Sequence, residues 1–136
     1  MTNQQAIDRA LYLLGFHEYG ASADATDSAD ALSSLNEMMY QWKTEDRDFD
    51  WFEQDDLTDT VPVPKWSYRA VIYNLAIELA AKFNIQPTAT VVTVADDSKR
   101  SITRHLMNTK IQGADMSHLP YGDGRNGRYN INSDTI

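Results

Sequence analysis

The sequence contains no cysteine and comparatively few basic residues. The lack of cysteine excludes disulfides, thiolate metal sites and thiol nucleophiles. With 12 Lys and Arg residues against 20 Asp and Glu, the net charge is −8. A protein that grips DNA needs an excess of basic surface to neutralise phosphates. Specific DNA binding is therefore not expected.

Long hydrophobic runs are also missing. A membrane-spanning helix needs about 20 consecutive apolar residues, and the apolar stretch at 76–81 is interrupted by Glu78. We therefore expect no membrane association. The composition, 136 residues of which 42% are hydrophobic, is that of a foldable domain large enough to bury a core.

Motifs that carry catalytic or metal chemistry are absent as well. The three histidines lack a zinc-ligand spacing, and the acidic residues lack the ligand spacing and glycine of an EF-hand. Acidic pairs such as Asp55 and Asp56 could serve a hydrolase, but 20 carboxylates make such pairs unavoidable. Gly122, Gly124 and Gly127 match a dinucleotide-loop spacing, yet no predicted strand precedes them and no helix follows. The sequence predicts no enzyme, cofactor or metal.

Two helices are predicted in the first third of the chain. Thr2 and Gln5 have capping-box spacing, and Gly15 stands where a helix would end in a left-handed conformation. A polar connector over 20–28 offers several candidate N-caps, Thr26 and Asp27 among them, and a second helix is expected from there to about residue 43. Its apolar stripe consists of Ala29, Leu32, Leu35, Met39 and Trp42, with Met38 beside it.

A long acidic loop is predicted over residues 44–64. Eight acidic residues lie between residues 44 and 65, and aromatic residues stand among them. Loops of this length in a compact domain are often functional. Two interpretations remain open: the tryptophans at 42, 51 and 66 pin the loop to the helices, or Trp51 or Phe52 anchors an interface with a partner.

The strongest helical pattern follows the loop. Pro64 stands before a third helix whose wide apolar face, from Tyr68 to Phe83, is the expected centre of the core, and Asn84 and Pro87 end it. Residues 88–110 give a mixed signal because 90–94 are β-branched enough for a strand. We favour one long helix opened at Thr88. Its polar middle suggests a helix that faces solvent or packs against a partner.

The remaining residues form a predicted extended arm over 112–136. This stretch contains several glycines and asparagines and one proline, and it cannot build a core. It nevertheless carries residue types that anchor interfaces, and an arm that orders on binding can cover a large area of a partner. A passive terminus is the alternative. The candidate partner-binding residues of the arm are Tyr121, Arg125, Arg128, Tyr129 and Ile131.

The predicted fold is therefore mainly α: a small bundle of about four helices in a domain over 1–111, with the long acidic loop and the extended C-terminal arm. Three segments, in this order, resemble the head-to-tail adaptor proteins of short-tailed phages, also called tail accessory factors or packaged-DNA stabilisation proteins. They are the Ala6-(x)3-Ala10-Leu11-(x)2-Leu14-Gly15 pattern, ADALSSLNEMMYQW at 29–42, and VPVPKW at 61–66 followed by LAIELA at 75–80.

This resemblance implies a structural protein of the virion, assembled in the host cytoplasm and located at the head–tail junction. It implies a homo-oligomeric ring, of twelve copies, beneath the portal protein, with tail or nozzle proteins as further partners. Such a ring extends the DNA channel, helps to retain packaged DNA, serves packaging and ejection, and attaches the tail. An acidic ring would let DNA pass without binding it. The family's C-terminal arm reaches to the portal.

Two other classes of protein stay open from sequence alone. One is a cellular helical regulatory or protein-binding module, in which the same helices form an ordinary bundle. The other is an enzyme, such as a wall hydrolase that uses two of the acidic residues. Assembly on a portal, a small oligomer without portal affinity, or activity lost in a double carboxylate variant would distinguish the three.

Overall fold

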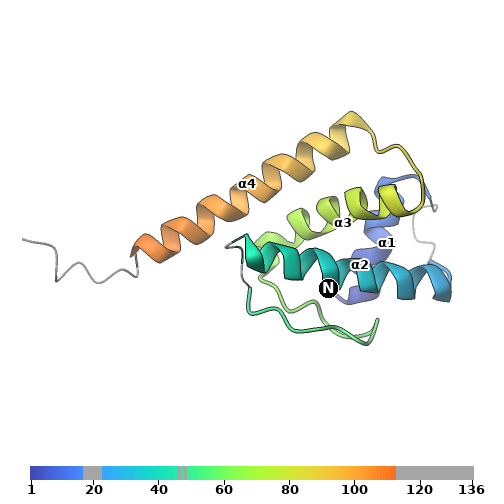
Figure 1. The fold of residues 1–136 in the computed structure, drawn as a ribbon, viewed down its shortest axis with the longest axis horizontal. Helices are drawn as coiled ribbons and strands as arrows, with labels where there is room; N and C mark the ends of the chain where they lie inside the picture. The colour runs from blue at the N-terminus through green and yellow to red at the C-terminus, as the bar shows by residue number, and fades with distance from the viewer. Residues whose placement is uncertain (17–22, 46, 48, 113–136) are drawn as a thin grey trace, which may run out of the picture.

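The computed structural model describes residues 1–16, 23–45, 47 and 49–112, with side chains described up to residue 109. These residues form four α-helices and one short 3-10 helix (Figure 1). Their bounds are α1 Asn3–Leu13, α2 Ala25–Thr44, η1 Lys65–Ser67, α3 Tyr68–Lys82 and α4 Ala89–Gln112. Within the described ranges there is no strand, only an isolated antiparallel bridge between Thr2 and Thr60. The predicted mainly α bundle is confirmed.

The first helix begins and ends as its sequence predicts. The backbone N–H of Gln5 donates to Thr2 Oγ1 at 3.2 Å, and the backbone N–H of Thr2 donates to Gln5 Oε1 at 3.1 Å. Such a cap stabilises a helix by about 1 kcal/mol. Gly15, with φ of 71°, follows the last turn in the left-handed region that only glycine enters at little cost.

The second helix begins within the predicted polar connector over 20–28. Asp24 is the N-cap, because its backbone is extended and its Oδ1 accepts from the N–H of Ala25 at 2.8 Å. The two candidates named above, Thr26 and Asp27, therefore lie inside the first turn, where the negative charge of Asp27 interacts favourably with the helix dipole. The predicted stripe is buried except for Ala29, which is exposed.

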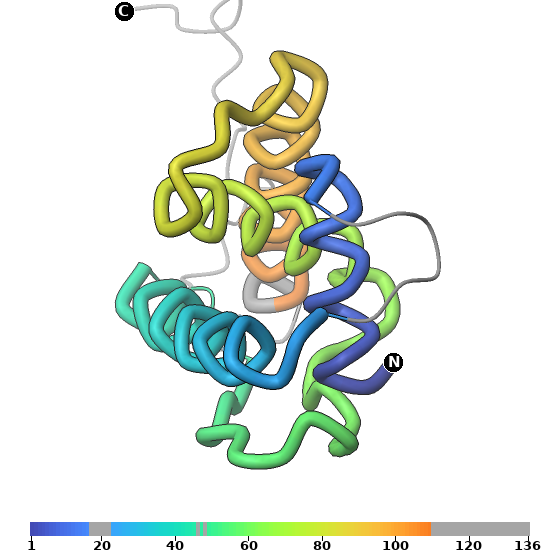
Figure 2. Tube along the Cα trace, turned by 90° about the vertical axis from the view of Figure 1, so that its right-hand side faces the viewer, coloured from blue at the N-terminus to red at the C-terminus, as the bar shows by residue number. Residues whose placement is uncertain are grey.

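The third helix is the centre of the bundle, as predicted. It packs against α1, α2 and α4, and Figure 2 shows it between them. Val71, Leu75 and Leu79 are completely buried along its length. The helix ends before Asn84, whose φ of 53° is left-handed and turns the chain towards α4.

The fourth helix is single and long, so the β-branched residues at its start are helical. Thr88 precedes it, and its Oγ1 accepts from the N–H of Val91 at 3.4 Å. Val91, Ala95 and Ile102 are buried on the side that packs against α3. Beyond Ile102 the described residues of α4 are exposed or half-buried, and the helix projects past the end of the bundle (Figure 1).

Candidate interaction surfaces

The acidic loop is fastened to the bundle by a buried set of amide side chains. The backbone N–H of Gln54 donates to Asn36 Oδ1 at 3.0 Å, and Asn36 Nδ2 donates to the carbonyl of Gln54 at 2.9 Å. Asn3 Nδ2 donates to Gln54 Oε1 at 3.2 Å and to the carbonyl of Asp56 at 2.7 Å. All three amide residues are buried. Hydrogen bonds of this kind hold the loop in one conformation against α1 and α2.

The backbone of the loop is tied to the start of the chain as well. The N–H groups of Asn3 and Gln4 donate to the carbonyls of Asp59 and Leu57, each at 2.9 Å, and the N–H of Val61 donates to the carbonyl of Met1 at 3.0 Å. The loop predicted over 44–64 is thus a fixed structural element in its described part. Its exposed carboxylates are displayed from a defined backbone.

The two candidate partner residues of the loop face opposite ways. Trp51 is only 4% exposed and packs within the core of this chain, whereas Phe52 is 61% exposed. A partner can therefore reach Phe52 but little of Trp51. The remaining candidates, Tyr121, Arg125, Arg128, Tyr129 and Ile131, lie outside the described residues.

A row of aromatic rings joins α2, the loop, η1 and α4. The ring centres of Trp42 and Phe49 are 6.5 Å apart, those of Phe49 and Trp66 are 5.8 Å apart, and those of Trp66 and His105 are 4.2 Å apart. Trp42, at one end of the row, is buried, whereas Trp66 and His105 at the other end are exposed. The row holds the middle of α4 against the loop, because tilted aromatic contacts add to apolar burial.

An ionic cluster next to this row fixes the end of α2 to α4. Glu45 lies 3.0 Å from Lys99 and also pairs with Arg47, whose Nε donates to Thr103 Oγ1 at 2.7 Å. The hydrogen bond from Lys99 is the main cause that lowers the pKa of Glu45, and the charges of Lys99 and Arg47 lower it further, against the partial burial that raises it. The side chains of Lys99 and Arg47 are thus already paired within the chain.

The exposed face of α4 is basic. Arg100, Arg104 and Met107 stand at positions i, i+4 and i+7, so they share one side of the helix. All three are exposed, Met107 by 56%. Arg100 lies 3.9 Å from Asp96, but both side chains are largely exposed, so this pair contributes little. We call these three residues the α4 stripe.

Acidic side chains line a groove between α2 and the loop. The groove has a volume of about 400 Å³ and carries Glu37, Glu53 and Asp55 on its walls. Tyr40, which is 42% exposed, and the buried Leu32 also line it. We call it the acidic groove. Among the described residues, none of the three carboxylates has an ion-pair partner.

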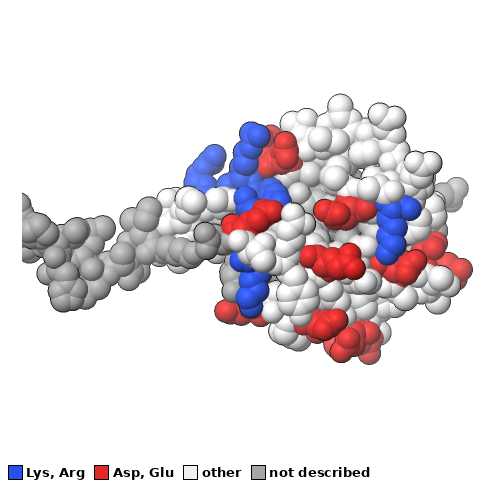
Figure 3. Space-filling model, in the orientation of Figure 1, with Lys and Arg blue, Asp and Glu red and all other residues white. Residues whose placement is uncertain are grey.

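The charges of the whole chain are divided in the same sense. Residues 1–60 contain 14 acidic and three basic residues, a net charge of −11, whereas residues 61–136 contain six acidic and nine basic residues, a net charge of +3. Figure 3 shows Lys and Arg gathered where α4 leaves the bundle, with most Asp and Glu elsewhere on that face. The net charge of −8 is therefore the sum of a strongly acidic region and a weakly basic one.

In the described part of the chain, no three His, Asp or Glu side chains lie close enough together to hold a metal ion. Nor does any helix in these ranges combine the length and the apolar character needed to cross a bilayer. The candidate interaction surfaces among the described residues are the α4 stripe, the acidic groove and the exposed Phe52.

A small helical bundle with a fixed acidic loop and a projecting basic helix defines the class of the protein, a small all-α protein. A family model described as P22 tail accessory factor matches residues 21–134. The chain belongs to this family, which gives it a structural role connected with the phage tail, as a component of the virion. None of the curated proteins searched matches the chain.

Proposed function

We propose that this protein is a head-to-tail connector that assembles as a ring beneath the portal protein, extends the DNA channel, helps to retain packaged DNA and attaches the tail. The match to the tail accessory factor family over residues 21–134 is the observation that carries the proposal. The role is structural and non-enzymatic. Its partners are the portal, neighbouring copies in a ring of twelve, and tail or nozzle proteins, with assembly in the host cytoplasm.

The charge of the chain supports a channel through which DNA passes. Phosphates are repelled by a surface of net charge −8, so DNA can slide without being held. The loop supports a role in assembly, because its buried amide contacts keep exposed side chains such as Phe52 in place before a partner arrives.

The C-terminal residues 112–136 are proposed as the arm that reaches the portal, with Tyr121, Arg125, Arg128, Tyr129 and Ile131 as its contacts. Aromatic and arginine side chains are the residue types most often found at the energetic centre of interfaces. Phe52 is proposed as a contact on the bundle itself.

The test is to mix the purified protein with a cognate portal and to measure the mass of the complex by light scattering. The full-length chain is compared with a truncation after Gln112. We expect the full-length chain to add in the portal's subunit number and the truncation to fail, although its thermal unfolding should be unchanged because the buried core lies within residues 6–102. If the full-length chain and the truncation both bound, the helices and not the arm would carry the portal interface. Binding by neither would contradict the connector role.

A further inference from the structure

We propose that the α4 stripe of one copy docks into the acidic groove of a second copy, so that neighbouring subunits join head to tail. The inference rests on the proposed function, because it names the surfaces by which subunits of the ring meet. A helix face in a groove is a common mode of protein recognition, with anchors at i, i+4 and i+7.

The basic side of the contact has unused binding capacity. Arg47 and Lys99 are paired with Glu45 inside the chain, but Arg104 has no ion pair with any described residue. Arg100 has only the long, exposed contact with Asp96. The guanidinium groups of Arg100 and Arg104 are therefore available to carboxylates of another molecule.

The groove offers the matching chemistry. Glu37, Glu53 and Asp55 supply three carboxylates without a partner among the described residues, enough for both arginines of the stripe. Leu32 and Tyr40 line the same groove and provide an apolar contact for a flexible side chain such as Met107. Aromatic and Met side chains at the centre with charges at the edge are typical of protein interfaces.

A second copy fits these surfaces better than DNA does. A DNA contact would use the two arginines but would bring phosphates towards a chain of net charge −8 and would leave the groove unmatched. In a contact between two copies, residues 61–136 of one copy, with a charge of +3, face residues 1–60 of its neighbour, with a charge of −11. Such a contact pairs both surfaces and orients the encounter.

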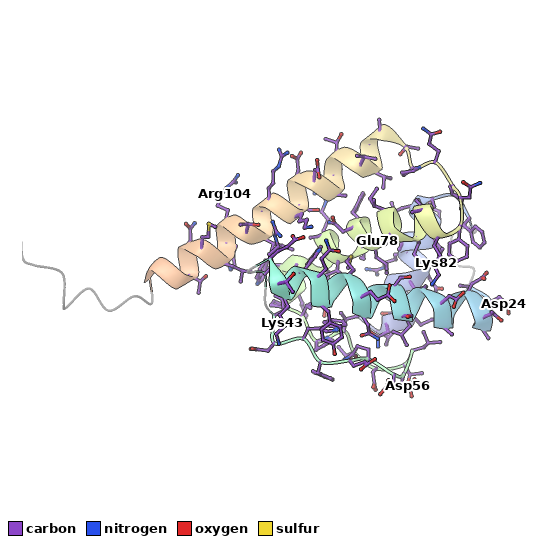
Figure 4. All side chains as sticks on the ribbon, viewed as in Figure 1. Asp24, Lys43, Asp56, Glu78, Lys82 and Arg104 are labelled. Atoms are coloured by element: carbon purple, nitrogen blue, oxygen red, sulfur yellow. The ribbon has the colours of Figure 1, made fainter. Side chains whose placement is uncertain are left out.

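The two surfaces lie on different sides of the molecule, which determines the kind of assembly. In Figure 4, Arg104 on α4 and Asp56, next to the groove residue Asp55, are on opposite sides of the bundle. Each copy can therefore use both surfaces at once. Such a heterologous contact adds copies one after another and forms a ring when the rotation closes.

Site-directed cross-linking tests the contact, because the chain has no cysteine of its own. The full-length variant Glu53→Cys/Arg104→Cys is assembled on the cognate portal and treated with a short bismaleimide. We expect a ladder of covalent multimers on a denaturing gel. The single variants should stay monomeric, since a heterologous contact never brings two copies of one position together. The control Glu78→Cys/Arg104→Cys, with a partner cysteine on α3, should give no ladder.

Each contrary result has its own meaning. Dimers from Arg104→Cys alone would replace the head-to-tail contact by a two-fold one and overturn the inference. An equal ladder from the control would do the same, because it would show no preference for the groove. A portal complex of full mass without any ladder would overturn the inference and leave the proposed function standing. Absence of any portal complex would contradict the proposed function itself.

A charge exchange provides the second readout. Arg104→Glu should lower the affinity with which copies assemble on the portal about tenfold or more, because it places like charges in contact. Adding Glu53→Lys in the same chain should restore part of this affinity. Assembly unaffected by Arg104→Glu, together with weaker binding to a short DNA duplex, would make DNA the occupant of the stripe and overturn the inference.

Discussion

The loop over residues 45–64 and the far half of α4 are both long, polar segments, yet the structure holds them in opposite ways. The loop has no regular secondary structure in its described part. It is fixed by hydrogen bonds among Asn3, Asn36 and Gln54 and by its own Trp51, which is buried in the core. The far half of α4 has regular helical hydrogen bonding, but after Ile102 its described side chains are exposed or half-buried. Order within a segment and attachment of that segment to the core are thus separate properties.

The difference follows from where the apolar and amide groups stand. A loop becomes rigid when its own backbone groups find buried partners, and Asn36 supplies both a donor and an acceptor to Gln54. A helix satisfies its backbone internally, so it can leave the bundle without leaving N–H and C=O groups unpaired. Thr103 and His105 still contact Arg47 and Trp66, so it is the exposed face of the projecting helix that is free to reach a neighbour.

Among the substitutions that test this difference, removal of the Trp51 side chain should have the largest effect on stability. Trp51→Ala leaves a cavity where this loop side chain packs in the core and should lower the free energy of unfolding by about 3–5 kcal/mol. Phe52→Ala is the matched control, since the neighbouring ring is 61% exposed and its loss should change stability by no more than about 0.5 kcal/mol. Urea unfolding followed by circular dichroism measures both. Equal effects would mean that the loop is not fixed by Trp51.

The attachment of α4 is tested in the same way at its last fully buried residue. Ile102→Ala should cost about 2–5 kcal/mol because it leaves a cavity against α3. Met107→Ala, just over one turn further along, should change stability by no more than about 0.5 kcal/mol. A large loss from Met107→Ala in the monomer would show that the far end of α4 packs on its own bundle and does not project.

The amide contact of the loop should have an intermediate effect. Asn36→Ala removes two hydrogen bonds and leaves the N–H and C=O of Gln54 buried without partners, which should cost about 1–3 kcal/mol. Hydrogen exchange at the amide of Gln54 should rise markedly. Ser33→Ala, an exposed change on the same helix, is the control. Unchanged exchange would show that the backbone contacts to Asn3 and Gln4 suffice to hold the loop.

The sequence predicts the helices well because their signals are local. The Thr2–Gln5 box and the apolar face of α3 each lie within one element. The strand-like residues at 90–94 fit a helix because Val91 and Ala95 bury against α3. The sequence leaves the cap of α2 open among several polar side chains at 20–28, and only the extended backbone of Asp24 decides between them.

The contacts of the loop were beyond sequence-based prediction because they join distant residues. Asn36 and Gln54 are 18 residues apart, and Asn3 and Gln54 are 51 apart. One signal was available: Asn36 follows Leu35 in the apolar stripe of α2, and a buried amide there needs a partner. The division of charge between −11 and +3 can also be read from the sequence, but only the fold shows that it separates the groove from the α4 stripe.

The ionic link between α2 and α4 should have the smallest effect, and it should depend on pH. The pKa of Glu45 is lowered from its ordinary value of 4.5 in the folded protein, mainly by the hydrogen bond from Lys99. The folded state therefore binds fewer protons than the unfolded state near this pH. The stabilisation is complete above the ordinary pKa and is lost as the pH falls through the lowered one.

Glu45→Gln should thus reduce stability at pH 7 by a few tenths of a kcal/mol, because the carboxylate is partly exposed to solvent. The difference between the two proteins should shrink as the pH falls below 4.5. Urea unfolding at a series of pH values measures it, with Glu78→Gln as a control that removes the same charge from α3. A constant difference across the series would mean that Glu45 acts through its shape and not through its charge, and that the aromatic row alone holds the middle of α4 to the loop.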